Sequence, residues 1–326
     1  METTLNAAQD LLFRFRTLTP VVQTSEKDAN DKAKLRTMRT FFDDSETPGE
    51  IPILSGNSFR GRMRRILAYA TWQSLDIDIQ EVYANGTGAL KETFHILTSG
   101  GTLGSGEKPM DRSIVAAVQN LLPILTLFGG SYAGSMHHGK IAVMNAKPAT
   151  LDLRSTFPRH VPEEWFENRA SGSTFTRGRE TKGTGGDFTI YRHPDRHIVE
   201  LPEVEAKAEP KEGEKSAANA YRNMPVSYDY ILPGTTMIWQ VVAGNDLTPL
   251  EWSMLGFAIQ KVVAFPFLGG KLQAGNGHVE WLDVPDDPRL SAEPFQDYLF
   301  SRRDELRALL THPKGLFRGL LTSGEE

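Results

Sequence analysis

Four arginines follow a small polar turn near residue 56, and their spacing suits the binding of a polyanion. Residues 51–67 read IPILSGNSFRGRMRRIL, so a short apolar lead runs into the turn and then into a helical pattern. The four cations are Arg60, Arg62, Arg64 and Arg65. Guanidinium groups bind phosphate oxygens in a bidentate manner, and the backbone N–H groups at a helix start attract anions. The sequence therefore predicts a cradle for several phosphates, with a solvated basic helix face as the alternative.

The expected helix must present these arginines in two groups. At 100° per residue, Arg60 and Arg64 fall on one flank of the apolar stripe, while Arg62 and Arg65 fall on the other flank and the back. Three polar side chains of the turn can each cap the first N–H groups of the helix: Ser55, Asn57 and Ser58.

A second glycine-rich stretch could approach the same ligand. Residues 268–277 read LGGKLQAGNG, between an expected helix and an expected strand. Glycine lets a backbone come close to a ligand, and Lys271 adds positive charge. A tight connector without a ligand is the alternative, and the presence of the arginine segment is what favours binding.

Other patterns indicate chemistry less well. Gly134–Lys140 resembles a phosphate-binding loop, but Ile141 stands where Ser or Thr should hold magnesium, and a strand rather than a helix should follow. Four histidines could suggest a metal site, yet no third ligand lies near the i, i+4 pair: His137, His138, His193 and His197. Cysteine is absent, which excludes disulfides and thiolate metal sites.

Loop aspartates could support metal-assisted or acid–base cleavage of RNA. Such residues are more often simply solvated, so we keep cleavage as an alternative. The candidates are Asp28, Asp31, Asp43 and Asp44.

The elements that would position these residues alternate between strand and helix. Residues 11–17 predict a strand, in which Phe13 and Phe15 face a core while Arg14 and Arg16 project from an open face. Further strands are expected at 139–146, 235–242 and 278–282, and helices at 112–127, kinked at a proline, at 248–264 and at 300–310. Without insertions the order is strand, helix, strand, strand, helix, strand, which predicts an α+β sandwich of the ferredoxin-like or RNA-recognition type.

Two irregular segments interrupt this order. Residues 18–50 are polar and predict a long loop, which is usually functional when so long. Residues 149–229 are rich in proline, glycine and charge, and predict an insertion that projects from the core.

Composition restricts the class of protein. The chain has 326 residues, 39% hydrophobic, with a net charge of −5, so a local basic groove is compatible with the sequence but a basic surface throughout is not. No run is long enough to span a membrane, and the first residues predict no signal peptide. We expect a cytoplasmic protein that needs no cofactor.

Five segments, in this order, resemble the RAMP superfamily of CRISPR-associated proteins: IPILSGNSFRGRMRRIL, FHILTSGGTLGSG, LFGGSYAGSMHHGKIAVMNA, LPGTTMIWQVV and FPFLGGKLQAGNGHVEW. The match covers about residues 11–282 and is most similar to the large backbone subunit of the type IV effector complex. The type I-D backbone subunit is the near competitor.

The resemblance implies a modified RNA-recognition (ferredoxin-like) palm with large inserted finger and thumb segments. The palm would comprise 1–148 and 230–285, with fingers at 18–50 and 76–127, a thumb-like segment at 149–229 and a helical tail at 286–326. Such subunits form helical filaments along the guide RNA (crRNA), with other CRISPR effector subunits, and present it to a target nucleic acid for base pairing in the prokaryotic cytoplasm. No catalytic residue and no metal site are implied.

The resemblance also implies residue roles. Ser58, Arg60, Arg64 and Arg65 would contact the guide backbone, with Lys271 and Gln273 near it. The thumb is assigned by charge and position to the stretch with Arg177, Arg179 and Lys182. The full set expected to bind RNA is Arg14, Arg16, Ser55, Asn57, Ser58, Arg60, Arg62, Arg64, Arg65, Arg177, Arg179, Lys182, Lys271 and Gln273.

Two alternatives remain open. Type III relatives cut target RNA with an aspartate in the loop after the first strand, so a metal-dependent endoribonuclease is the first. An RNA-recognition module that acts as a monomer, unrelated to CRISPR, is the second.

Overall fold

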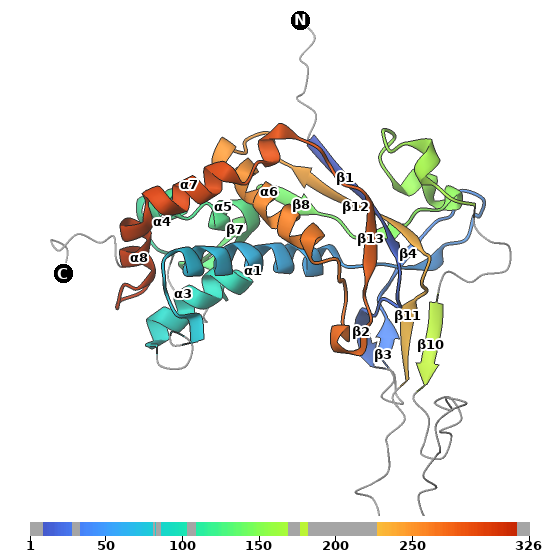
Figure 1. The fold of residues 1–326 in the computed structure, drawn as a ribbon, viewed down its shortest axis with the longest axis horizontal. Coiled ribbons are helices and arrows are strands. Elements are labelled where there is room, and N and C mark those ends of the chain that lie inside the picture. The colour runs from blue at the N-terminus through green and yellow to red at the C-terminus, as the bar shows by residue number, and fades with distance from the viewer. Residues whose placement is uncertain are drawn as a thin grey trace, which may run out of the picture.

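A five-stranded sheet forms the centre of the molecule (Figure 1). The computed structural model describes residues 9–27, 33–80, 82, 86–102, 109–168, 177–181 and 227–317. The strand order is β13-β1-β12-β8, all antiparallel, with a short β9 that also pairs with β12. The strands are β1 (Gln9–Thr17), β8 (Ile141–Val143), β9 (Lys147–Pro148), β12 (Thr236–Ala243) and β13 (Val279–Asp283). Mixed helix and sheet confirms the predicted α+β class.

One face of this sheet packs against two long helices, α1 (Gly56–Ser74) and α6 (Pro249–Ala264). Phe13 lies opposite Trp239 in the β1–β12 register, and their rings stack with centroids 4.4 Å apart. Phe59 of α1 stacks on the same Trp239 ring, with centroids 4.2 Å apart. The alternation of β1 and the 3.6-residue period of α1 therefore meet in one core, as both patterns predict.

The start of α6 also follows its sequence signal. Thr248 accepts a hydrogen bond from the Glu251 backbone, and the Glu251 carboxylate accepts one from the Thr248 backbone at 2.8 Å. Pro249 occupies the first helical position, where its missing N–H costs nothing. This capping box is confirmed.

The opposite face of the sheet is covered at β1, which corrects one expectation. Leu12 and Ile238 pack into a second hydrophobic cluster built largely from residues 149–166. Arg14 donates from Nε to Asp283 Oδ2 at 2.5 Å, and its guanidinium lies 5.2 Å from the Trp165 ring centroid. Arg14 therefore does not project from an open face, because the 3₁₀ segments around Trp165 fold over it; Arg16 is exposed.

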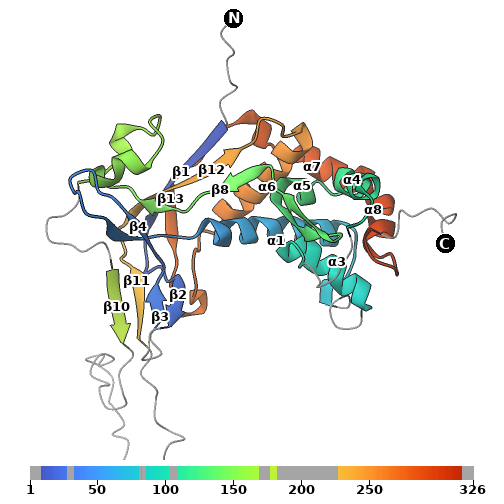
Figure 2. The ribbon, with the colours of Figure 1, turned by 180° about the vertical axis from the view of Figure 1, so that it is seen from behind.

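A group of short helices and a hairpin lies beyond α1, at the end opposite β10 and β11 in both views (Figure 1 and Figure 2). Asp111 caps α4, and the helix predicted at 112–127 breaks at Pro123, as expected. The apolar run at 94–97 lies in a helix that was not predicted from the sequence. The terminal helix predicted at 300–310 is instead parts of two helices that meet at Arg302. The elements are α3 (Gly88–Ser99), α4 (Arg112–Leu121), α5 (Ile124–Phe128), β6 (Gly129–Tyr132), β7 (Ser135–His138), α7 (Glu293–Ser301) and α8 (Arg303–Leu310).

Part of the long loop predicted at 18–50 forms strands instead. β4 (Thr37–Thr40) and β5 (Gly49–Pro52) form a hairpin, while β2 (Thr24–Lys27) and β3 (Ala33–Leu35) join a second sheet. That sheet has the order β10-β11-β3-β2, with β10 (Arg177–Thr181) and β11 (Ser227–Ile231) from the predicted insertion. The strands within 18–50 are only three or four residues long and mostly polar, so they show no apolar alternation that would have predicted them.

None of the helices in the described part of the chain is long and apolar enough to cross a membrane.

Candidate nucleic-acid interface

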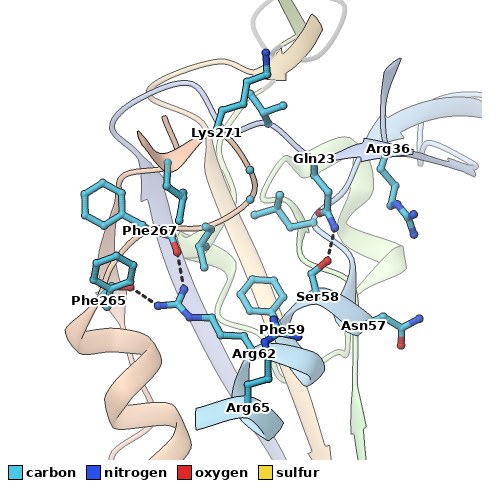
Figure 3. Close-up of a pocket in the computed structure, with 16 residues that line it drawn as sticks. Gln23, Arg36, Asn57, Ser58, Phe59, Arg62, Arg65, Phe265, Phe267 and Lys271 are labelled. Atoms are coloured by element: carbon cyan, nitrogen blue, oxygen red, sulfur yellow. Dashed lines mark hydrogen bonds between the residues drawn. The ribbon is translucent and has the colours of Figure 1, made fainter. Parts of the chain in front are cut away.

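A cleft of about 650 Å³ lies between the start of α1 and the glycine-rich loop after α6 (Figure 3). Asn57, Ser58, Arg62 and Arg65 line one wall, and Phe265, Phe267 and residues 268–272 line the other. Two segments 200 residues apart, singled out by composition, are thus brought together as expected. Their contact with RNA stays a prediction.

The first turn of α1 is fixed by side chains from other segments. The Ser55 N–H donates to Gln23 Oε1 at 2.7 Å, and the Gly56 N–H donates to Asn145 Oδ1 at 2.9 Å. The amide of Gln23 also donates to Ser58 Oγ at 2.6 Å. These bonds occupy two of the N–H groups that an anion at the helix start would use.

The predicted side-chain cap is therefore wrong. Ser55 is the N-cap residue, but its hydroxyl makes no capping hydrogen bond in the described structure. Gln23 and Asn145 supply the acceptors instead, since neighbouring segments bring their amides against the turn.

Two of the arginines face the cleft side of α1, as the helical wheel predicts. Arg62 donates to the carbonyl of Phe267 at 2.5 Å and to that of Phe265 at 2.6 Å, so it ties α1 to the opposite wall. Burial, followed by the nearby charge of Arg65, lowers the pKa of Arg62. Arg65 is exposed at the cleft, where it can meet a phosphate.

The other two arginines bind backbone carbonyls; Arg64 is buried, whereas Arg60 is half-buried and lines a second pocket. Arg60 and Arg64 donate to the carbonyls of Phe128 and Gly129, on the far side of α1. Arg64 is only 4% exposed, and burial, then the charge of Arg60, lowers its pKa to about 10. The expectation that Arg64 contacts guide phosphates is corrected, because its guanidinium is committed to the interior.

The glycine-rich loop is held on the turn after β1. The Gly270 N–H donates to the carbonyl of Val22 at 2.7 Å, and the Gly277 N–H donates to that of Pro20 at 2.8 Å. Gly269 has a φ of +82°, and a Cβ there would lie 2.5 Å from the Val22 carbonyl oxygen, so this position requires glycine. Lys271 is exposed and lines the cleft, whereas Gln273 is exposed outside it.

Three further residues line the cleft that the sequence did not predict as part of the site: Gln23, Arg36 and Phe265. Arg36 belongs to the basic segment that precedes α1, so its charge was a usable signal. The sequence FPF at 265–267 directly precedes the glycine loop, and paired aromatics beside cations are a pattern typical of single-strand binding. Gln23 gave no signal.

The residues assigned to a thumb lie elsewhere. Arg177 and Arg179 are on β10, opposite Ile231 and Asp229 of β11. In the strand order this is the edge of the second sheet away from β2. Lys182, like Asp28, Asp31, His193 and His197, lies outside the described residues.

The alternative chemistries find little support in the described region. The Asp43 carboxylate accepts hydrogen bonds from the backbone N–H and hydroxyl of Ser155, so it stabilises a 3₁₀ helix, and Asp44 is exposed. Residues 135–138 form a hairpin strand, and Lys140 pairs with the buried Glu251 at 2.9 Å. Within the described ranges no three His, Asp or Glu side chains gather as a metal site.

Among the comparisons with known proteins, only the comparison of structures gives a match. No protein-family model matches the chain, and no curated protein matches it in sequence. A solved structure shares the fold. It is a chain described as "Type IV-B CRISPR Complex", with a TM-score of 0.51 and 16% sequence identity, over 87% of this chain and 96% of that one. At that identity the likeness establishes the fold.

Proposed function

We propose that the chain is a non-catalytic, guide-RNA-binding backbone subunit of a CRISPR effector complex, most similar to type IV. The observation that carries the proposal is the cleft of α1 and the glycine-rich loop, within a fold shared with a chain of a Type IV-B CRISPR complex. The resemblance of five sequence segments to the RAMP superfamily supports it independently.

The proposal assigns the parts of the fold. The central sheet with α1 and α6 is the RNA-recognition palm (1–148 and 230–285), and the segments 18–50 and 76–127 are fingers. Residues 149–229 form the thumb-like insertion, and 286–326 the tail. Copies of the subunit pack along the guide RNA in the prokaryotic cytoplasm, together with other effector subunits, while target sequence is read by base pairing.

The chemistry of the cleft suits a carrier of variable guides. Arg65 and Lys271 are exposed on facing walls, and cations bind phosphates without regard to base sequence. Arg62 is bound to two backbone carbonyls, which fixes the spacing of the walls. A guide carrier needs binding that does not depend on base sequence, since spacer sequences differ.

Replacing the two exposed cations tests the proposal. Arg65→Ala with Lys271→Ala should weaken binding of short single-stranded RNAs of unrelated sequence to a similar degree. Each lost phosphate contact should flatten the plot of log Kd against log salt by about 0.7, so the double variant by about 1.4. Fluorescence anisotropy between low and moderate salt measures both quantities.

The matched control removes the same charge elsewhere. Arg112→Ala with Arg307→Ala alters two exposed arginines on α4 and α8, at the other end of the molecule. Its salt slope should equal that of the native chain. Equal losses in both variants, or a loss confined to one RNA sequence, would contradict a phosphate-binding cleft.

Assembly and cleavage are checked with the native chain. Light scattering should show particles whose mass rises in steps with RNA length and falls after ribonuclease treatment, while labelled RNA remains intact with added magnesium. A monomer that ignores RNA would refute the proposal, and metal-dependent cleavage lost in Asp44→Ala would favour an endoribonuclease instead.

A further inference from the structure

Phe265 presents an aromatic ring at the wall of the cleft. It is 54% exposed and directly follows Ala264, the last residue of α6. Large exposed apolar side chains are common singly, so exposure alone indicates little. The surroundings of this ring distinguish it.

The backbone that carries the ring is held by Arg62 of the opposite wall (Figure 3). Arg62 binds the carbonyls of Phe265 and Phe267, and its guanidinium carbon lies 5.4 Å from the Phe265 ring centroid. The rings of Phe265 and Phe267 are 5.1 Å apart, and Phe267 stacks on His278 at 4.9 Å with an interplanar angle of 19°. The exposed ring is therefore the outermost member of a fixed aromatic row.

The groups around the ring exclude a simply apolar partner. Arg65 and Lys271 are exposed cations on the same cleft, and Asn57 and Ser58 are exposed polar residues of its α1 wall. An apolar peptide segment would have to desolvate these groups without satisfying them. A ligand with flat rings and regularly spaced anionic groups satisfies both features at once, and single-stranded nucleic acid has this chemistry.

We infer that Phe265 stacks on a base of bound single-stranded RNA, while Arg65 and Lys271 hold the adjoining phosphates. The inference rests on the proposed function and adds a base contact to it. A phenyl ring stacks on any base, so this contact tolerates every guide sequence.

A cycle that removes the ring and the base separately tests the contact. The probes are an oligouridine of about eight nucleotides, short enough for a single site, and a fully abasic oligomer of the same length. Phe265→Leu should weaken oligouridine binding by about 5- to 150-fold, the range for one stacked base, and leave abasic binding unchanged. Phe265→Tyr, which keeps a stacking ring, should retain native affinity for both probes.

Phe300→Leu is the matched control, since Phe300 is 81% exposed on α7, outside the cleft. Native affinities in this variant are expected. Equal losses of Phe265→Leu on both probes would overturn the inference, because they would indicate a structural role. Normal short-RNA binding with failed assembly on long RNA would also overturn it, by assigning the ring to a neighbouring copy.

The proposed function and this inference can fail separately. If Arg65→Ala with Lys271→Ala weakens oligouridine binding but Phe265→Leu does not, the phosphate cleft stands and the stacking contact falls. If the native chain binds neither probe, both fall.

Discussion

Arg64 is buried and contacts two groups that are remote in sequence, a backbone carbonyl and an aromatic ring. Its guanidinium donates to the Gly129 carbonyl and lies 5.6 Å from the Phe128 ring centroid. A Cβ at Gly100 would come within contact of the same guanidinium, so a glycine there leaves room for it. A buried cation is costly unless hydrogen-bonded, and these contacts offset that cost. At the scale of the residue, neighbouring arginines of one helix therefore have different roles.

Arg64→Ala should lower the free energy of unfolding by about 2–4 kcal/mol, since it leaves a cavity and an unpaired buried carbonyl. Arg65→Ala, one position along, should change it by less than about 0.5 kcal/mol because Arg65 is exposed. Urea unfolding followed by circular dichroism measures both. If the two variants lost equal stability, the interior role of Arg64 would be wrong.

At the scale of the element, the position of α1 depends on its first residue. Gly56 packs so closely on β8 that a Cβ would lie 2.0 Å from the Val143 carbonyl oxygen. The helix start is thereby set against the sheet edge, and Asn145 reaches its N–H from the same segment. This contact therefore sets the position of the α1 wall of the cleft.

Gly56→Ala should therefore shift the start of α1 and lower the free energy of unfolding by about 1–3 kcal/mol or more, the range for overpacked cores. Gly88→Ala is the matched control, because Gly88 also begins a helix, α3, and nothing lies within 4 Å of its Cβ position. The control should be neutral or stabilising by about 0.5–1 kcal/mol. Comparable urea midpoints for the two variants would argue against the close approach.

At the scale of the whole molecule, two segments far apart in sequence build one sheet. β3 pairs with β11, and β11 pairs with β10 in a register that sets Thr181 opposite Ser227. The ends of residues 182–226 are thus adjacent. The second sheet is held by strands on both sides of that segment.

Replacing 182–226 by the dipeptide Asn-Gly should therefore leave the fold intact. A two-residue turn suits adjacent antiparallel strands, and a short connection between paired strands loses less conformational entropy on folding than a long one. The thermal unfolding midpoint should be no lower than in the native chain, and short-RNA binding should persist, because the cleft lies in other segments. An unfolded or markedly less stable variant would show that the second sheet depends on 182–226.

Most of the features that were predicted correctly depend on signals within one element. The face of α1, the alternation of β1, the capping box of Thr248 and Glu251 and the break at Pro123 all depend on neighbours within a few residues. The helix α3 was missed although its signals were local, since Thr87 caps it and Gly100 ends it in the left-handed conformation.

What could not be read depends on contacts across the chain. The burial of Arg64 depends on a carbonyl 65 residues away, and the capping of α1 depends on an amide 32 residues away. The strands β2 and β3 are short and pair with each other, and β3 also pairs with β11, which is remote in sequence. The cleft itself was foreseen as a pairing of two segments, but its aromatic row was not.

The central position of β1 has a consequence for synthesis on the ribosome. Its two neighbours, β12 and β13, begin at Thr236 and Val279, and Arg16 pairs with Thr236, 220 positions further on (236 − 16). At about 5–20 residues per second, β1 waits roughly 10–40 s for its first neighbour to be translated. During that interval Phe13 and Phe15 lack both neighbouring strands, so we expect β1 to stay unpaired until the last third of the chain emerges.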